Sequence, residues 1–362
     1  MNPLKAIWSI LFRLFPCPVK VGLCMIGKPD RQSPVLVTCN FYLTVRRMMA
    51  GLRGLDIWLL IADSKGVNVW CAAGGEEFST HAVVSVLKTS GITDKVDHRT
   101  VILPPLGAPG IQAKALEQET GWSVKWGPVR INDISAYLEN NQQRSEDMKR
   151  VTYNWRERLD TAAGPLFPFF VAGAFGFLIF GSHLLMNYLA VATIAFFFFM
   201  LACPWLPGRS GFAKVIVLEI LLILIWIVTN IFQIGVGGSM HANLVIAMVM
   251  LLVYGSELGG LAATMPSDLD PFLAKLGIGA IGNVEFAGTI RTELLNGVRT
   301  LTYYPENCVG CLNCMEICPQ GCWAIDPEKH AVLARKEKCT ACRACIVQCE
   351  GQAIKAESKS GF

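Results

Sequence analysis

Two long stretches without charged residues dominate the hydrophobic pattern of the chain. No Asp, Glu, Lys or Arg occurs at positions 161–208, and none occurs at 220–256. A helix needs about 20 apolar residues to cross a bilayer, and polar or glycine-rich breaks divide the stretches into segments of about that length. The pattern predicts a helical transmembrane domain over residues 146–265, with four spans at 164–180, 184–206, 212–232 and 240–261.

The distribution of Lys and Arg orients these expected spans. Basic residues gather in cytoplasmic loops, and here they precede the first span, lie at Arg209 and Lys214 after the second, and follow the fourth at Lys275. We therefore expect a multi-pass protein of the cell (inner) membrane with cytoplasmic soluble domains. Residues 266–302 are interpreted as a linker or interfacial segment, with a fifth span at 271–290 as the alternative.

Short apolar runs alternate with helical patterns before the membrane segment. Runs at 35–38, 58–62, 101–103 and 123–126 predict strands, and apolar spacing at 78–87, 111–120 and 131–139 predicts helices. This order is typical of a Rossmann-like α/β domain, which we place at residues 33–145. Residues 1–32 have apolar positions interrupted by Lys5, Arg13 and Lys20, and are expected to form an amphipathic segment at the membrane surface.

Domains of this kind bind ligands at the carboxyl ends of their strands. Two expected loops there, residues 63–75 and 103–110, are rich in Gly and Ala, which let a large flat ligand approach the backbone. Trp70 beside Cys71 offers a packing surface next to a soft metal ligand. By itself, however, a lone cysteine in an apolar run is more often a buried structural thiol.

Composition and charge narrow the class of protein. Of the 362 residues, 52% are hydrophobic and 17% are charged, whereas a soluble domain carries roughly a quarter charged residues. The net charge of +4 is small, and Lys and Arg form no long basic run that could follow a phosphate backbone. We therefore expect membrane rather than nucleic acid as a partner.

Eight of the fourteen cysteines fall in an internal repeat with the spacing C-x2-C-x2-C-x3-C. Three cysteines of each run suit one cubane, while the fourth crosses to the other. The expected [4Fe–4S] ligands are Cys308, Cys311, Cys314 and Cys349 for one cluster, and Cys318, Cys339, Cys342 and Cys345 for the second. A structural zinc site is the alternative, but eight ligands with crossed spacing suit paired cubanes better.

The cysteine-rich part resembles bacterial two-cluster ferredoxins, which implies an α+β domain at residues 303–362. One departure is Glu350, which stands where proline usually follows the last ligand. Cys322 is left over and is expected to be a buried packing residue.

The run Asn68-Val69-Trp70-Cys71-Ala72-Ala73-Gly74 resembles the cap-helix signature of the mercury-methylation corrinoid protein family. The resemblance extends to residues 35–40, 106–110 and 127–130 and to the membrane region. Family members work with a separate two-cluster ferredoxin, so this chain resembles the two proteins joined in one. Its corrinoid domain is also similar to that of the corrinoid iron–sulfur protein of the acetyl-CoA pathway.

The resemblance implies a membrane-anchored, corrinoid-dependent methyltransferase that converts Hg(II) to methylmercury. Cys71 would be the lower cobalt ligand, and the ferredoxin domain would reduce cobalt to Co(I). A methylated pterin methyltransferase or another methyl-donor protein and a low-potential electron donor are the implied partners. The implied cofactor contacts are Thr38, Asn40, Asn68, Val69, Trp70, Cys71, Ala72, Ala73 and Gly74. His81 and His98 are alternative cobalt ligands, although each is expected to be an ordinary surface or helix residue.

Two departures from the family bear on the methyl acceptor. Gly75 replaces the usual Lys after the signature, and the chain ends without the terminal cysteine pair of the partner ferredoxin. A second hypothesis is therefore a corrinoid methyl carrier for another acceptor, either a metalloid or a carrier of the one-carbon, acetyl-CoA pathway. A third is a membrane iron–sulfur electron-transfer protein whose α/β domain is only a docking module.

Overall fold

The computed structural model shows the α/β and cysteine-rich parts of the chain and portions of the apolar middle. The described residues are 16–152, 155, 171, 175, 179, 182–202, 205–206, 211–231, 243–249, 251, 299–335, 339 and 342–358. The chain divides into two compact units, one chiefly of residues 153–282 and the other chiefly of residues 15–152 together with 292–362. The expected spans 164–180 and 240–261, the segment 266–302 and residues 1–15 lie wholly or mostly outside the described residues.

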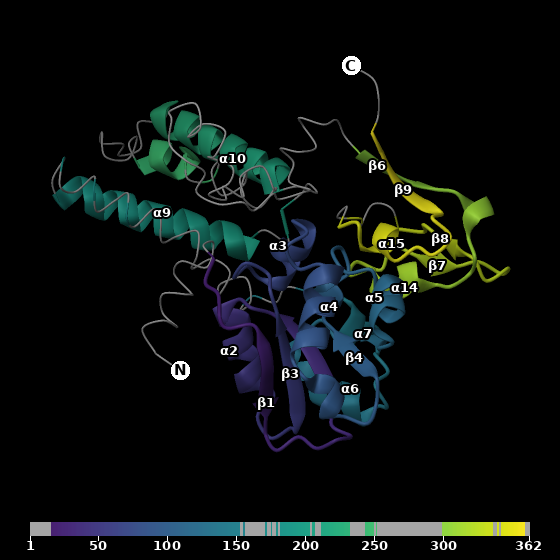
Figure 1. The fold of residues 1–362 in the computed structure, drawn as a ribbon. Coiled ribbons are helices and arrows are strands. Elements are labelled where there is room, and N and C mark those ends of the chain that lie inside the picture. Colours follow the sequence, from purple (N-terminus) through teal and green to yellow (C-terminus); the bar gives the residue numbers. More distant parts are fainter. Residues whose placement is uncertain are drawn as a thin grey trace, which may run out of the picture. The chain divides into compact units, whose positions relative to one another are not determined.

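Five strands form the sheet of the α/β domain, in the order β1-β3-β2-β4-β5 (Figure 1). Four of them run parallel: β2 (Val35–Cys39), β3 (Ile57–Ala62), β4 (Thr100–Leu103) and β5 (Ser123–Trp126). Every residue of β2 and β3 is buried. These strands are continuous apolar runs because helices cover parallel sheets on both faces.

Helices pack on the two faces of this sheet. On one face, α2 (Tyr42–Gly51) and α6 (Ile134–Glu139) bury Met48 and Tyr137 against a cluster that includes Leu59 and Ile102. Helices α4 (Thr80–Thr89) and α5 (Ala113–Thr120) pack against each other and contact β3 and β5 respectively. The shorter elements are α3 (Val69–Gly74), α7 (Glu146–Lys149), η1 (Ile92–Asp94), η2 (Pro105–Gly107) and η3 (Ile131–Asp133).

The four expected strands are confirmed, with ends shifted by at most one residue, but the interpretation of the residues before them is wrong in part. Strand β1 (Gly22–Ile26) lies within the segment expected to be an amphipathic surface element, and it pairs antiparallel with β3. Its residues are mostly half-exposed, so the strong apolar signal of a central strand is missing. Its strand conformation follows from pairing with β3, which is far along the chain.

The cysteine-rich part has the expected α+β architecture. Strand β6 (Arg299–Tyr303) pairs antiparallel with β9 (Ile354–Ser358), and β7 (Ala324–Ile325) pairs with β8 (Ala331–Val332). The helical elements are η4 (Pro305–Asn307), α14 (Asn313–Ile317) and α15 (Ala344–Val347). Trp323 is buried in the core beside cysteine side chains, with its ring edge-on to Tyr303 at a centroid distance of 5.4 Å.

Two long apolar helices belong to the other compact unit. Helix α9 (Ser182–Ala202) and helix α10 (Gly211–Ile231) coincide with the second and third expected spans, and Phe199, Val215 and Leu218 are buried in one cluster there. Within the part of the chain that the structure describes, no helix is both long and apolar enough to cross a bilayer. The four-span domain is therefore not confirmed.

Candidate functional site

A cavity of about 220 Å³ lies at the carboxyl ends of the parallel strands. Its wall includes Thr38 at the end of β2, Leu103 at the end of β4, and Gly127 just after β5. Asn68, Val69 and Trp70 at the start of α3 complete one side. This is the edge where open α/β sheets bind ligands, so the cavity is the leading candidate for the cofactor site.

Helix α3 begins at an Asn cap. The Oδ1 atom of Asn68 accepts a hydrogen bond from the backbone N–H of Cys71 at 3.1 Å. This satisfies one of the backbone donors that a helix leaves unpaired in its first turn. The same bond fixes the backbone of Cys71, whose side chain is half-buried.

The small residues after Cys71 allow α3 to pack against another backbone. Ala72 and Ala73 are buried, and η2 packs against α3. A Cβ atom added at Gly110 would come within 2.9 Å of the carbonyl oxygen of Ala73, closer than real Cβ contacts occur. Gly and Ala are therefore required at this crossing for close packing of backbone on backbone.

Asn40 organises the loop that leads into α3 and is not available to a ligand. Its Oδ1 atom accepts hydrogen bonds from the backbone N–H of Ser64, the hydroxyl of Ser64 and the backbone N–H of Gly66, at 2.8–3.0 Å. Its Nδ2 atom donates to a carboxylate oxygen of Asp63 at 3.2 Å and to the carbonyl oxygen of Val19 at 3.5 Å. Its side chain is buried and fully hydrogen-bonded, so the expectation that Asn40 contacts the cofactor is replaced by a positioning role.

The other expected cofactor contacts divide into groups. Thr38, Asn68, Val69 and Trp70 line the cavity, whereas Cys71 lies on the same helical turn but is not part of its wall. Ala73, Gly74 and His81 line a second cavity. His98 lies away from both, because its ring nitrogens bond to the carbonyl oxygen of Ser33 at 3.0 Å and to the N–H of Thr100 at 3.2 Å. Of the two alternative cobalt ligands, only His81 is near α3.

The cavity suits part of a large flat apolar group. Its volume is below the roughly 300–1,000 Å³ of typical small-molecule sites, so such a group would be only partly enclosed. Its lining is mainly apolar, with Trp70 39% exposed at the rim. A half-buried thiol one residue from this rim is a soft donor suited to a transition metal. These residues fit a corrinoid, whose cobalt the thiol of Cys71 would be suited to bind.

The first cysteine set gathers around Cys314. Burial, followed by the charges of Cys311, Cys349 and Cys308, raises the pKa of Cys314 to about 12. Cys314 is buried in the core cluster against which Cys349 packs, so the last cysteine of the second run lies with the first set. Four cysteines with this spacing form a ligand set of the kind that holds an iron–sulfur cubane.

The second cysteine set lines one cavity. Cys318, Cys339, Cys342 and Cys345 all contribute to its wall, together with Trp323. Burial, followed by neighbouring thiols, raises the pKa of Cys342 to about 11. Cys318 of the first run therefore lies beside three cysteines of the second run.

Cys318 and Cys349, the fourth cysteines of the two runs, each accept a hydrogen bond from a backbone N–H four residues later in the chain. The N–H of Cys322 donates to Sγ of Cys318 at 3.3 Å, and the N–H of Ala353 donates to Sγ of Cys349 at 3.2 Å. Hydrogen bonds to cluster sulfurs tune reduction potentials. Cys322 is itself buried beside Trp323, as expected for a packing residue.

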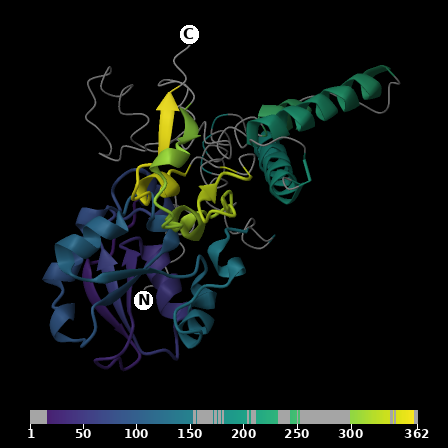
Figure 2. The same cartoon turned by 90° about the vertical axis from the view of Figure 1, so that its right-hand side faces the viewer.

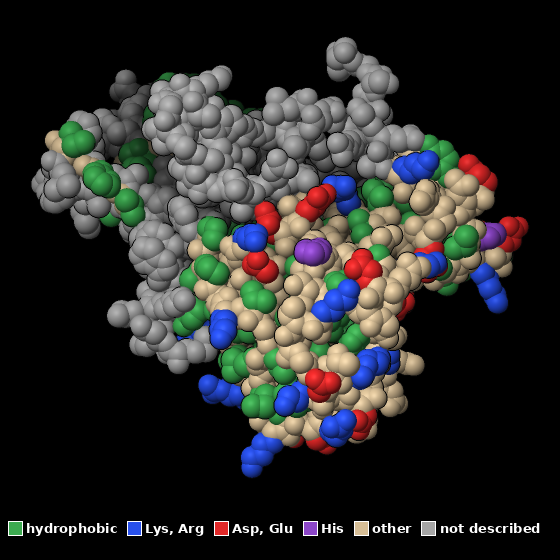
Figure 3. Space-filling model, in the orientation of Figure 1, with side chains coloured by type: hydrophobic (Ala, Val, Ile, Leu, Met, Phe, Trp, Pro, Cys, Tyr) green, Lys and Arg blue, Asp and Glu red, His purple; other side chains and the backbone are tan. Residues whose placement is uncertain are grey.

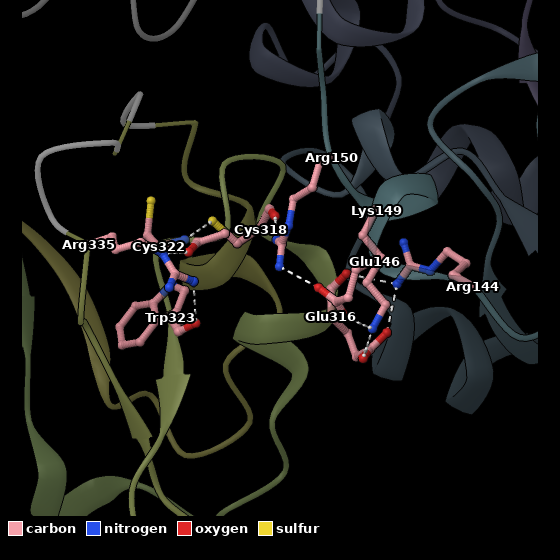
Figure 4. Close-up of polar contacts among 10 residues, drawn as sticks. Arg144, Glu146, Lys149, Arg150, Glu316, Cys318, Cys322, Trp323 and Arg335 are labelled. Carbon is pink, nitrogen blue, oxygen red and sulfur yellow. Dashed lines mark hydrogen bonds and ion pairs between the residues drawn. The ribbon is translucent and has the colours of Figure 1, made fainter.

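The cysteine-rich part contacts the α/β domain through a polar group that the sequence analysis missed (Figure 4). Glu316 pairs with Arg144 at 3.0 Å and with Lys149 at 2.7 Å. Arg150 donates from Nη1 to the carbonyl oxygen of Cys318 at 2.7 Å. Figures 1 and 2 both show these two parts side by side within their compact unit. Nothing in the local pattern marks these residues, because their partners are more than 160 positions away.

Surface charge on the α/β domain is mixed. On the face drawn in Figure 3, Lys and Arg side chains are interspersed with Asp and Glu. That face therefore has no continuous basic track of the kind that binds a phosphate backbone.

Fold and site together define the class: an α/β ligand-binding domain joined to an iron–sulfur domain. Residues 14–138 match the family model described as CO dehydrogenase/acetyl-CoA synthase delta subunit, and residues 301–323 match a 4Fe-4S binding domain. The comparisons support corrinoid binding and an iron–sulfur cluster. The second model covers only the first cysteine run, so the number of clusters still rests on the repeat.

The similar proteins are subunits of one kind of complex. The acetyl-CoA decarbonylase/synthase complex subunit gamma of Methanopyrus kandleri is 38% identical over 126 residues, covering 34% of this chain and 27% of that protein. The subunit of the same name from Methanocaldococcus jannaschii is 32% identical over 149 residues, covering 41% and 29%. That from Archaeoglobus fulgidus is 35% identical over 128 residues, covering 35% and 27%.

The chain spans less than a third of the length of these relatives. Their names point to the acetyl-CoA pathway and do not single out the mercury-methylation family. The expectation of a corrinoid domain is thus supported, and the expectation of mercury as the acceptor is not confirmed.

Proposed function

We propose that this chain is a corrinoid-dependent methyl carrier whose iron–sulfur domain supplies electrons to the cobalt. The observation that carries the proposal is the cavity at the carboxyl ends of the strands, lined by the start of α3 with Cys71 one residue beyond its wall, in one compact unit with eight cysteines in two sets. A bound corrinoid supplies a cobalt centre that accepts and releases a methyl group.

The residues of the chain have distinct roles in this proposal. Thr38, Val69 and Trp70 would hold the corrinoid, and the thiolate of Cys71 would be a soft ligand to its cobalt. Asn68 fixes the backbone of Cys71 through the cap bond. A thiolate is a soft ligand that donates strongly to a transition metal.

Each cysteine set holds one [4Fe–4S] cluster in this proposal. The first set is Cys308, Cys311, Cys314 and Cys349, and the second is Cys318, Cys339, Cys342 and Cys345. A low-potential donor supplies the electrons, and a methyl-donor protein or methylated pterin methyltransferase supplies the methyl group.

The relatives favour a methyl acceptor of the one-carbon, acetyl-CoA type, because all three are named as acetyl-CoA decarbonylase/synthase subunits. A second candidate is Hg(II), a soft electrophile. It is favoured by the run from Asn68 to Gly74, which resembles the mercury-methylation signature and forms the Asn-capped helix beside the cavity.

The proposal is tested first by metal content. Protein purified anaerobically with corrinoid supply should contain about one cobalt and about eight iron atoms per chain, since each cubane holds four. The visible spectrum of the corrinoid should change in Cys71→Ala but not in Cys24→Ala, a second half-buried cysteine outside the cavity wall. Iron without cobalt in the wild-type protein would instead support the membrane electron-carrier hypothesis.

The acceptor is tested on the loaded protein. Methyl transfer to a partner acetyl-CoA synthase subunit with no methylmercury formed would support the first candidate. Methylmercury formation that disappears in Cys71→Ala would support the second.

The proposal places the protein at the cell membrane, with its two metal-binding domains in the cytoplasm. It rests on the uncharged stretches at 161–208 and 220–256. The chain should stay in the membrane fraction after extraction with alkaline carbonate. Release into the supernatant would contradict this placement.

A further inference from the structure

The iron–sulfur domain is held against the α/β domain by a buried side chain between two cluster ligands. Gln348 lies between Cys345 and Cys349 in the chain and is only 6% exposed. Its Nε2 atom donates to the carbonyl oxygens of Ala108 at 2.9 Å and Ile111 at 2.6 Å. Its Oε1 atom accepts from the backbone N–H of Ala113 at 3.3 Å. Both ends of the amide are therefore committed to the loop between η2 and α5.

An ion pair lies at the edge of this contact. Glu350 accepts from the ammonium of Lys114 at 2.8 Å, and its other oxygen accepts from Nδ2 of Asn313 at 3.1 Å. Proline is usual at the position of Glu350 in similar ferredoxins, and proline could make neither contact. Ala108, Ile317 and Ala344 form a small buried apolar cluster across the same boundary.

The contact brings the second cysteine set next to the end of α3. A cavity of about 410 Å³ is lined on one side by Trp70, Ala73 and Gly110, and on the other by Cys342 and Arg343. Trp70 also lines the candidate cofactor cavity, so its indole borders both spaces. Cysteines of the first set line neither of these two cavities.

We propose that the cluster on Cys318, Cys339, Cys342 and Cys345 is the one that passes electrons to the cobalt, past Trp70, and that Gln348 holds it there within a single chain. The inference rests on the proposed function and adds the order of the two clusters. In each transfer the second cluster loses one electron and the cobalt gains one, and no bond within the protein is made or broken. A low-potential one-electron donor then restores the cluster, either directly or through the first cluster.

The first experiment perturbs the contact without removing a metal ligand. Gln348→Ala removes the partner of two buried carbonyl groups, at Ala108 and Ile111, and of the half-buried N–H of Ala113. Arg31→Ala is the matched control, because Arg31 forms an exposed ion pair with Asp97 on a different surface of the α/β domain. Loaded protein is mixed with reduced methyl viologen, and absorbance follows the clusters and the cobalt separately. Hydrogen exchange at residues 108–113 reports the contact itself.

Wild-type protein should reduce its cobalt at a rate independent of protein concentration, as expected for transfer within one chain. Gln348→Ala should speed exchange at residues 108–113 and slow cobalt reduction at least tenfold, while the viologen reduces the clusters as before. Arg31→Ala should change neither. Faster exchange with an unchanged rate of cobalt reduction would overturn the proposal.

A second comparison tests the order of the clusters. Cys342→Ser and Cys311→Ser each weaken one cluster, and iron content shows which chains keep the other. Cobalt reduction should be slowed more by Cys342→Ser than by Cys311→Ser, and an equal or reversed order would overturn the proposal. Failure of the proposed function is distinct, because the wild-type protein would then contain no cobalt.

Discussion

Replacing Asn40 by Ala should release the loop that leads into α3. Of the five hydrogen bonds that the change removes, three are buried bonds to Oδ1, from the N–H and hydroxyl of Ser64 and from the N–H of Gly66. Each buried bond contributes about 1 kcal/mol net, so their loss should cost about 3 kcal/mol. Ser64 and Gly66 are buried, and water cannot replace the lost partner without opening the loop.

Hydrogen exchange at the amides of Ser64 and Gly66 measures this cost directly. A loss of about 3 kcal/mol corresponds to a roughly hundredfold faster exchange through local opening. Asn140→Ala is the matched control, because the amide of Asn140 is exposed and makes a single bond to the carbonyl oxygen of Gln143. That variant should leave the loop unchanged.

The same variant distinguishes positioning from direct cofactor contact. If Asn40 acts only through the loop, Asn40→Ala should lower cobalt content in proportion to loop opening and leave the corrinoid spectrum of the loaded fraction unchanged. An altered spectrum with normal exchange at Gly66 would refute the positioning role. Exchange accelerated less than about fivefold would refute the energetic argument.

Three further predictions concern neighbouring features. Burial alone would raise the pKa of Glu316, but its hydrogen bonds to Lys149 and Arg144 and their charges lower it below its usual 4.5. The stabilisation from this carboxylate is therefore complete above about pH 4.5 and is lost as the pH falls through the lowered value. Because Glu316 is half exposed, this stabilisation should amount to at most about 1 kcal/mol. Hydrogen exchange at the N–H of Val151, which donates to the carbonyl oxygen of Pro319, should become faster in acid for the wild type and should lose this pH dependence in Glu316→Gln. Gly110→Ala should lower the free energy of unfolding by about 1–3 kcal/mol, because the new Cβ overlaps the backbone at Ala73. An unchanged midpoint of denaturant unfolding of the intact chain would contradict this. Trp70→Ala should weaken corrinoid binding about tenfold, since an aromatic wall of the cavity is removed. Titration of cobalt-free protein with corrinoid measures this affinity, and Trp126→Phe, which lies outside that wall, is the control.

Much of the fold follows from local pattern. The central strands of the α/β domain are legible as unbroken apolar runs because helices bury them on both faces. The cysteine repeat predicts which thiols share a cluster because cubane geometry restricts the spacing of ligands. Helix α2 was not predicted, although its buried residues Tyr42, Val45 and Met48 recur at helical spacing. Composition marked residues 63–75 as a loop, and only the resemblance to a cap-helix signature indicated that residues 69–74 are helical.

The sequence by itself therefore determined the α/β class, the edge of the sheet that holds the candidate cavity, and the two sets of cysteines. The tertiary structure decided what surrounds them. It turned Asn40 from a cofactor contact into the support of a loop, paired β1 with β3, and joined Gln348 to carbonyl groups about 240 positions earlier. Periodicity and spacing record only neighbours along the chain, whereas a buried polar group is satisfied by whichever partner the fold brings to it.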